Sequence, residues 1–242
     1  MQPISMILTR FKENISWTYD LPKDISIIVY NKGPDELKAP DTHPNITIHN
    51  KIVNLGRESE TILRYIMLNY DNLPDVMVFS QADPATHSPD FIKLLWKIQN
   101  NGLSQDIFPM TLRWEPEHPP VVVYSPFKDS YYIETASRFT LGALRFWDDG
   151  IKNVYFDYCY VNPEYIVGTD VYNHFCKMIG IDDPDFEKKS TFDFFYSGCF
   201  AVKKEAVLQH SKNFYMNCLS IVNRHPVFGF FFERIWWKLF NR

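Results

Sequence analysis

Short apolar runs without polar alternation constrain the fold of this chain more than any other feature. They occur at Ser5–Thr9, Ile25–Tyr30 and Val76–Phe79, with a shorter candidate at Ile46–His49. A strand that is covered on one face alternates apolar and polar residues, whereas a strand covered on both faces does not. The runs therefore predict buried strands of a mainly parallel sheet.

A helical pattern separates the last two of these strands. After Asn54–Glu58, the residues Ile62, Leu63, Ile66, Met67 and Tyr70 fall within one arc at roughly 100° per residue. Asp71–Pro74 ends that helix with turn-forming residues. Strands that alternate with helices predict an α/β fold, and the length of 242 residues suits one domain that covers residues 1–242.

The second half of the chain is less regular. Val154–Tyr160 and Phe194–Val202 read as further strands, and the latter carries a glycine at its centre, where another backbone or a ligand comes close. Two helices are predicted at the C-terminal end, Lys203–Val222 with an interruption near Ser211, and Phe230–Arg242.

Composition and charge exclude several classes of protein. The net charge is −4 and no basic run is interleaved with aromatic residues, which argues against nucleic-acid binding. No segment approaches the roughly 20 apolar residues of a membrane span, and the N-terminus does not resemble a signal peptide. The four cysteines form no CxxC pair. Together these features lead us to expect a cytoplasmic protein.

Polar side chains follow the predicted strands. Ligands of open parallel sheets bind beyond the carboxyl ends of the strands, so residues at these positions are candidates for a site. They are Arg10, Glu13 and Asn14 after the first strand, Asn31 and Lys32 after the second, and Gln81, Asp83 and His87 after the fourth.

Asp83 is the first candidate for chemistry. A carboxylate directly after a buried strand, with the His87 imidazole four residues later, can hold a divalent cation that bridges two phosphates. The alternative is structural, because Asp83-Pro84 also begins turns and caps helices. Sequence alone leaves both interpretations open.

Gly56-Arg57-Glu58 stands just before the first long helix. Free backbone N–H groups at a helix N-terminus, joined by an arginine, bind phosphate. The alternative is a loop glycine followed by a solvated ion pair.

Glu233 lies in the last predicted helix, at the border of an apolar arc. The wheel places Arg234 and Lys238 on the opposite, polar half. A partly desolvated carboxylate has a raised pKa and suits a general base, whereas a salt bridge to a neighbouring arginine is the structural alternative.

Taken together and in order, these segments resemble a widespread family known only as a domain of unknown function, whose members look like compact glycosyltransferases of the A-type (GT-A) fold. The segments that carry the resemblance are Thr9–Trp17, Tyr30–Gly33, Gly56–Glu58, Gln81–Pro84 with His87, and Glu233–Trp236. The resemblance spans nearly the whole chain. It implies a single GT-A-like domain, with a nucleotide-binding half over residues 1–100 and an acceptor-side half over residues 101–242.

The resemblance also implies a function, the transfer of a sugar from a nucleotide-diphosphate sugar to a hydroxyl of a glycan or another acceptor. Such enzymes often hold Mn²⁺ or Mg²⁺ on an Asp-x-Asp motif, whose place is taken here by Gln81-Ala82-Asp83, so the first acidic residue is missing. Asp83 is then the expected metal ligand, and the Ser197–Cys199 segment the expected acceptor-side wall. The residues expected to bind the donor are Thr9, Arg10, Glu13, Asn31, Lys32, Arg57, Glu58, Gln81 and His87, and those expected to act in catalysis are Asp83 and Glu233.

A different class of function remains open. The absence of the first acidic residue favours a non-catalytic module that binds a nucleotide or a glycan without turning it over. A hydrolase that uses Asp83 and Glu233 as a carboxylate pair has no support from the sequence, which does not give their separation.

Overall fold

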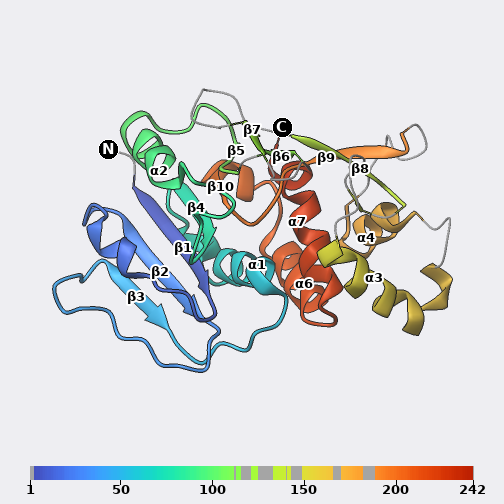
Figure 1. Ribbon diagram of the computed structural model, residues 1–242, viewed down its shortest axis with the longest axis horizontal. Coiled ribbons are helices and arrows are strands. Elements are labelled where there is room, and N and C mark those ends of the chain that lie inside the picture. The colour runs from blue at the N-terminus through green and yellow to red at the C-terminus, as the bar shows by residue number, and fades with distance from the viewer. Residues whose placement is uncertain are drawn as a thin grey trace.

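A mixed six-stranded sheet forms the centre of the protein (Figure 1). The computed structural model describes residues 3–111, 113–115, 121–124, 133–139, 141–142, 149–165, 170–181 and 189–241. In spatial order the strands are β3 (Ile46–His49), β2 (Ser26–Asn31), β1 (Ile4–Arg10), β4 (Val76–Gln81), β10 (Phe200–Lys203) and β5 (Ile107–Pro109). The strands β1 to β4 run parallel, and β10 lies antiparallel between β4 and β5.

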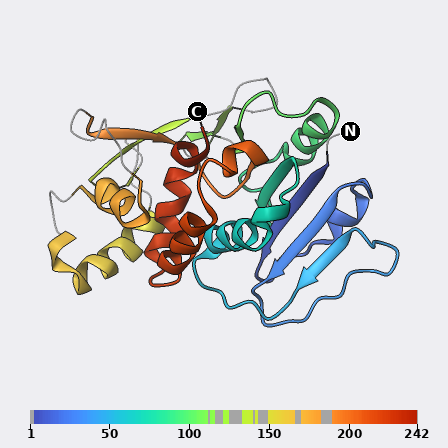
Figure 2. The ribbon, with the colours of Figure 1, turned by 180° about the vertical axis from the view of Figure 1, so that it is seen from behind.

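Helices cover both faces of this sheet (Figures 1 and 2). The remaining elements, in chain order, are η1 (Ser16–Asp20), α1 (Arg57–Asn69), η2 (Tyr70–Asn72), α2 (Phe91–Asn101), β6 (Arg113–Glu115), β7 (Val121–Tyr124), β8 (Glu134–Ser137), α3 (Asp149–Val161), η4 (Pro163–Tyr165), α4 (Val171–Ile179), β9 (Thr191–Phe194), α5 (Lys204–Val207), α6 (Lys212–Val222) and α7 (Val227–Phe240). The β6–β7 and β8–β9 pairs form two small antiparallel sheets. No helix in the described ranges is long and apolar enough to cross a membrane.

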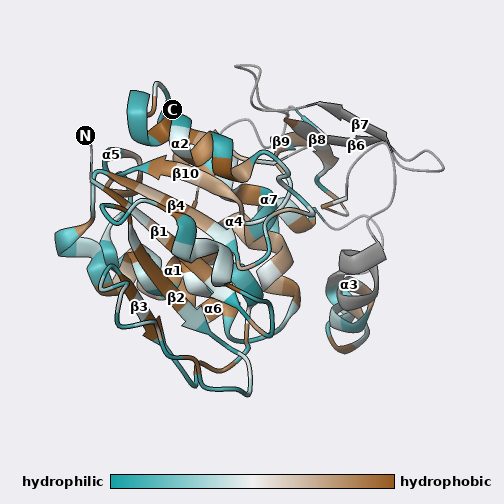
Figure 3. Cartoon of the chain, turned by 60° about the vertical axis from the view of Figure 1, so that its left-hand side comes forward, coloured by the Kyte–Doolittle hydropathy of each residue, from teal (hydrophilic) through white to brown (hydrophobic). Residues whose placement is uncertain are grey.

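Burial on both faces explains why the central strands lack polar alternation. Successive side chains of a strand point to opposite faces. Ile7 of β1 and Phe79 of β4 belong to one core, with Trp236 of α7, and Met6 and Val78 belong to the other core, which α2 covers. Figure 3 shows the resulting apolar strands. The predicted α/β class with a mostly parallel central sheet is confirmed.

The chain changes direction across the sheet at β1. It moves outward from β1 through β2 to β3 and then returns through α1 to β4 on the other side of β1. In register, Thr9 of β1 pairs with Tyr30 of β2 and with Gln81 of β4. The carboxyl ends of three strands therefore meet at the point where strand order reverses, which is the usual ligand position in open α/β sheets.

The strand predicted at Val154–Tyr160 is wrong, because the segment belongs to α3. Tyr155, Tyr158 and Cys159 are buried while Phe156 and Tyr160 are exposed, which is a spacing of three and four residues. Two of the exposed positions are also aromatic and only Asp157 between them is polar, so the helical period is concealed in the sequence.

The single strand predicted at Phe194–Val202 is divided into β9 and β10. Phe194 pairs with Glu134 in the β8–β9 sheet, whereas Phe200 pairs with Phe79 in the central sheet. Ser197 between them has a φ of 66°, outside the strand region, so the chain turns from one sheet into the other. The segment Phe139–Trp147, whose sequence also favours a short helix, falls largely outside the described residues.

The aromatic cluster beneath β10 predicts a large stability effect. Trp236 is fully buried and lies within 5.9 Å of both the Phe200 and Phe240 rings, measured between centroids. We expect Trp236→Ala to lower the free energy of unfolding by about 3–5 kcal/mol, because it leaves a cavity in the core. Urea unfolding measures this, with Trp96→Ala on the exposed side of α2 as the control. Equal losses in the two variants would contradict this packing.

Candidate functional site

A cavity of about 200 Å³ lies beyond the carboxyl ends of β1 and β2, at the N-terminus of α1. Its described lining residues are Thr9, Arg10, Phe11, Glu13, Lys32, Asn54, Arg57 and Glu58. Six of these were predicted as donor-binding residues from the sequence. The cavity brings together residues from three elements that are separated by up to 49 positions along the chain, from Thr9 to Glu58.

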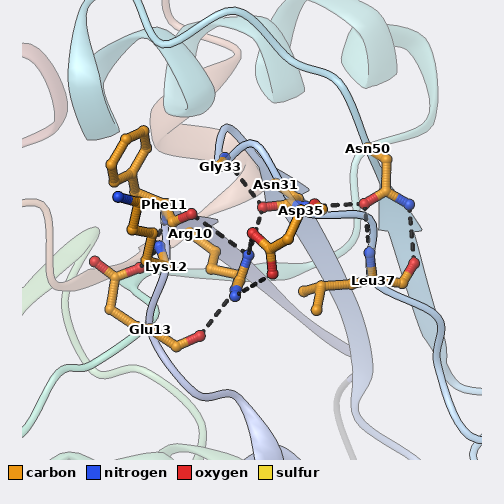
Figure 4. A network of polar contacts seen from close by, with 9 residues as sticks. All are labelled: Arg10, Phe11, Lys12, Glu13, Asn31, Gly33, Asp35, Leu37 and Asn50. Carbon is orange, nitrogen blue, oxygen red and sulfur yellow. Dashed lines mark hydrogen bonds and ion pairs between the residues drawn. The ribbon is translucent and has the colours of Figure 1, made fainter.

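Arg10 organises one side of the cavity (Figure 4). Its guanidinium is buried and donates from Nη1 and Nη2 to the two carboxylate oxygens of Asp35, at 2.8 and 2.9 Å. It also donates to Asn31 Oδ1 at 2.8 Å and to the Glu13 carbonyl at 2.8 Å. The guanidinium holds the pKa of Asp35 below its ordinary value. Arg10 therefore fixes the loops that follow β1 and β2.

Asn31 extends the same network and is fully buried. Its amide donates to the Asp35 carbonyl at 2.5 Å and to Asn50 Oδ1 at 2.9 Å, as Figure 4 shows. Nearby, a Cβ on Gly33 would lie only 1.6 Å from the carbonyl oxygen of Phe11, so no other residue fits there. The two strand-end loops are thus in direct backbone contact.

Glu13 is an ionised acceptor at the rim of the cavity. Partial burial opposes ionisation, but the backbone N–H groups of Phe11 and Lys12 donate to Oε2 at 2.7 and 3.0 Å and the pKa is lowered overall. The second carboxylate oxygen, with the half-buried Thr9 beside it in the lining, is placed to accept hydrogen bonds from a polar ligand.

Lys32 and Glu60 form a buried ion pair behind the cavity. Nζ lies 2.8 Å from Glu60 Oε2, and each side chain is 1% exposed. The ammonium also donates to the carbonyls of Leu55 and Arg57, at 3.1 and 2.6 Å. Burial lowers the pKa of Lys32, and the Glu60 carboxylate opposes that shift. Lys32 therefore ties the loop before α1 to the sheet.

That loop has an unusual backbone. Gly56 and Arg57 have φ angles of 60° and 52°, and a left-handed conformation is uncommon for a residue with a side chain. A Cβ on Gly229 of α7 would lie 3.0 Å from the Gly56 carbonyl oxygen, and Ser59 Oγ donates to the Gly229 carbonyl at 2.7 Å. Close packing of α7 and the Lys32 contacts together hold the strained turn in place.

Arg57 is the accessible cation of this site. Its side chain is 52% exposed, and Nε forms an ion pair with Glu58 Oε2 at 3.5 Å, as the structural interpretation of this segment expected. The guanidinium carbon lies 4.8 Å from the centre of the Phe230 ring. It stands at the first turn of α1, where backbone N–H groups have no partner within the helix. An exposed guanidinium beside a helix N-terminus is chemically suited to bind a phosphate group.

Glu58 and His87 join the cavity to the end of β4. Glu58 is 17% exposed, and a Cβ on Gly198 would lie 3.0 Å from the Glu58 Cβ, so Gly198 makes room for this side chain. Partial burial lowers the pKa of His87. The positive charge of Arg57 adds to this shift, whereas the negative charges of Glu58 and Asp83 oppose it. Burial therefore favours the neutral form of His87, which lies within electrostatic reach of all three residues.

Asp83 is exposed and follows β4 as predicted. Its Oδ1 accepts from the N–H of Ala85 at 3.3 Å, and its carbonyl accepts from Gln81 Nε2 at 2.6 Å, which is the turn geometry of the structural interpretation. Within the described ranges, no group of three His, Cys, Asp or Glu side chains is arranged to hold a metal ion. Asp83 is a lone carboxylate, so a cation here would take most of its ligands from a bound molecule and water.

Glu233 lies one helical turn beyond Phe230 on the same face of α7, with its side chain 12% exposed. Arg234 Nη1 lies 3.4 Å from Glu233 Oε2. The predicted wheel is wrong about Arg234, which is buried rather than solvated. Its guanidinium carbon lies 4.9 Å from the centre of the Phe194 ring and 5.1 Å from the centre of the Tyr196 ring, because the β9 segment covers this side of the helix.

Sequence reasoning missed three residues of this region, Asp35, Glu60 and Phe230. Glu60 is a charged residue within an apolar helical face, which is a signal of a buried ion pair, but its partner is 28 residues away. Asp35 and Phe230 carry no local signal, since their roles depend on the loop and helix that pack against them.

Comparison with known proteins gives limited information. A family model described as "Protein of unknown function (DUF3431)" matches residues 6–107. This is less than the nearly complete match that the sequence resemblance predicted, and it leaves Ser197–Cys199 and Glu233 outside. No curated protein is similar enough in sequence to match.

Among solved structures, CMP:2-keto-3-deoxy-manno-octonic acid synthetase complexed with CTP is similar at 8% identity and a TM-score of 0.31. That similarity covers 91% of this chain and 84% of the synthetase chain. It is loose, and no functional assignment follows from it.

The buried pair behind the cavity generates a stability prediction. Glu60→Gln leaves the Lys32 ammonium buried without its counter-ion, and we expect a loss of about 3 kcal/mol in the free energy of unfolding. The control is Glu36→Gln, which removes a carboxylate from the exposed pair with Lys51. Urea unfolding should show no measurable change in the control. Two variants of equal stability would mean that Lys32 and Glu60 do not support the loop.

Proposed function

We propose that this protein is a glycosyltransferase of the A-type fold, which binds a nucleotide-diphosphate sugar in the cavity beyond β1 and β2. The observation that carries the proposal is the exposed Arg57 guanidinium at the N-terminus of α1, inside a cavity at the reversal point of the sheet. Nucleotides bind at such reversal points in open α/β sheets, with phosphates at a helix N-terminus.

Each part of the donor has a counterpart in the proposal. The diphosphate accepts hydrogen bonds from Arg57 and from the first N–H groups of α1. The ribose and base lie toward Thr9 and Glu13, whose oxygens accept from hydroxyl and amino groups. Arg10, Asn31 and Lys32 act as positioning residues, since their polar atoms already bind Asp35, Asn50 and Glu60.

The proposed reaction is a displacement at the anomeric carbon. Glu233 accepts the proton of an acceptor hydroxyl while that oxygen bonds to the anomeric carbon, and the bond from that carbon to the diphosphate breaks. The diphosphate leaves with the electron pair and is stabilised by Arg57. Glu233 shares a helix face with Phe230, which packs under Arg57, and this supports a position near the donor.

The proposal includes a divalent cation, Mn²⁺ or Mg²⁺, with fewer protein ligands than an Asp-x-Asp motif would supply. Asp83 would supply its protein ligand, and the cation would neutralise charge on the diphosphate. Asp83 has no second carboxylate beside it in the turn, because Gln81 stands where an Asp-x-Asp motif has its first acidic residue. These protein ligands therefore fit only a cation that arrives bound to the nucleotide.

The second candidate function is a module that binds a nucleotide or glycan without catalysis. Gln81, in place of an acidic residue, is the observation that favours it. The two functions share the same cavity and differ in turnover, so binding and transfer have to be measured separately.

Arg57 generates the binding prediction. We expect Arg57→Gln to weaken the binding of a nucleoside diphosphate at least tenfold, because a charge-assisted contact to phosphate is lost. Isothermal titration with UDP, GDP, ADP and CDP, each with and without Mn²⁺, measures this, and Lys23→Gln is the control. Tighter binding with Mn²⁺ that disappears in Asp83→Asn supports the cation. If no nucleotide binds to the wild-type protein, the proposal fails.

Glu233 and Asp83 generate the catalytic prediction. With a donor chosen by the binding assay, we expect Glu233→Gln to lower kcat at least 100-fold with little change in donor affinity, because general-base catalysis contributes typically 10²–10⁴-fold. Asp83→Asn should lower kcat/KM and alter the Mn²⁺ dependence. Released nucleotide is the readout. Wild-type rates in both folded variants would favour the binding module.

A further inference from the structure

A second and larger cavity, of about 500 Å³, lies at the other end of α7. It is lined by the antiparallel β8–β9 pair, the first turn of α4 and the C-terminal end of α7, which Figure 1 shows in the same part of the molecule. Its volume is within the range of roughly 300–1,000 Å³ that is typical of ligand sites. Neither the donor nor the metal residues discussed above belong to it.

Arg138 forms the rigid floor of this cavity. The side chain is 2% exposed, its Nε lies 3.4 Å from Asp170 Oδ2, and Nη1 donates to the Lys189 carbonyl at 3.2 Å. Its guanidinium carbon lies 4.8 Å from the centre of the Tyr172 ring, and Phe192 stacks on Tyr172 at 4.2 Å. Asp170 balances the charge of this guanidinium, so Arg138 and the rings beside it give the cavity a fixed shape.

Two lysines bring positive charge to the walls of the cavity. Lys189, on the segment before β9, and Lys238, on α7, line it, and both are exposed. Among the described lining residues the only acidic side chain is Asp193, which accepts from Thr135 Oγ1 at 3.3 Å. With Arg138 balanced by Asp170, the two lysines against Asp193 leave this described lining with one net positive charge, whereas the whole chain carries −4.

The remaining lining groups indicate a ligand rich in hydroxyl groups. Thr191, Asn241 and Asp193 offer hydroxyl, amide and carboxylate groups that pair with hydroxyls. Phe192 and Trp237 are half-buried and present ring surface to the same space. Rings that alternate with hydrogen-bonding groups suit a ligand with apolar faces and polar edges. Combined with the positive charge, this lining fits a sugar chain that bears carboxylate groups.

We propose that this cavity binds an acidic carbohydrate, and that this carbohydrate is the acceptor of the proposed transfer. The acceptor role rests on the proposed function, whereas the binding itself does not. Phe230, Glu233 and Trp237 lie along one face of α7, and seven residues of helix span roughly 10 Å. In this proposal, a short oligosaccharide held at Trp237 extends over that distance toward Glu233 and Arg57.

Isothermal titration with trigalacturonate, and with neutral maltotriose as the matched ligand, tests the binding. We expect the wild-type protein to bind trigalacturonate at least tenfold more tightly than maltotriose. The double variant Lys189→Glu/Lys238→Glu should lose at least tenfold in affinity for trigalacturonate. The control Lys23→Glu/Lys38→Glu makes the same change in net charge at exposed positions outside the cavity and should stay within twofold of wild type.

Two results would overturn the proposal. One is equal affinity for the acidic and neutral trisaccharides, and the other is an equal loss in the two double variants, which would reflect long-range charge alone. Titration of the same proteins with UDP, GDP, ADP and CDP separates this proposal from the proposed function. If the protein binds trigalacturonate but none of the four nucleotides, the cavity is supported as a site for an acidic carbohydrate. The role of that carbohydrate as the transfer acceptor is then overturned.

Discussion

The structure depends on the burial of β1 between two parallel neighbours and two helical layers. Ile7 faces α1 and α7 while Met6 and Leu8 face α2, so neither face of the strand meets water. Such a strand has to end where its polar backbone and side chains can be satisfied. At that end Arg10 donates to Asp35 and Asn31 and joins the loops after β1 and β2.

A second constraint joins the C-terminal helix to this edge of the sheet. Gly229 of α7 approaches Gly56 so closely that a Cβ at Gly229 would lie 3.0 Å from the Gly56 carbonyl oxygen, and Ser59 Oγ donates to the Gly229 carbonyl. The same approach fixes the left-handed turn that presents Arg57. One helix thereby supports the first cavity at its N-terminal end and lines the second cavity at its C-terminal end, which links the two proposals physically.

The strands of the first half and the order of their elements were predictable because each signal is local. Ile25–Tyr30 and Val76–Phe79 are short, rich in apolar residues and bounded by turns, and six residues that follow strands or begin α1 do line one cavity. The second half was less predictable. Tyr155–Tyr160 has aromatic residues on both the buried and the exposed sides of α3, and Phe194–Phe200 passes between two sheets at Ser197. Neither the helix at the first segment nor the division of the second between two sheets shows in the two-residue period of strands or the 3.6-residue period of helices.

The sequence by itself determined the α/β class, the buried strands and the polar residues at their ends, since strand burial and turn chemistry act over a few neighbouring positions. Only the tertiary structure decided which of those polar residues are exposed to a ligand. Arg10 and Lys32 looked equivalent to Arg57 in the sequence, yet the first two are buried against Asp35 and Glu60 while Arg57 is half exposed. The difference arises because a charge that leaves water needs a partner, and those partners lie 25 and 28 residues away, at positions that only folding brings together.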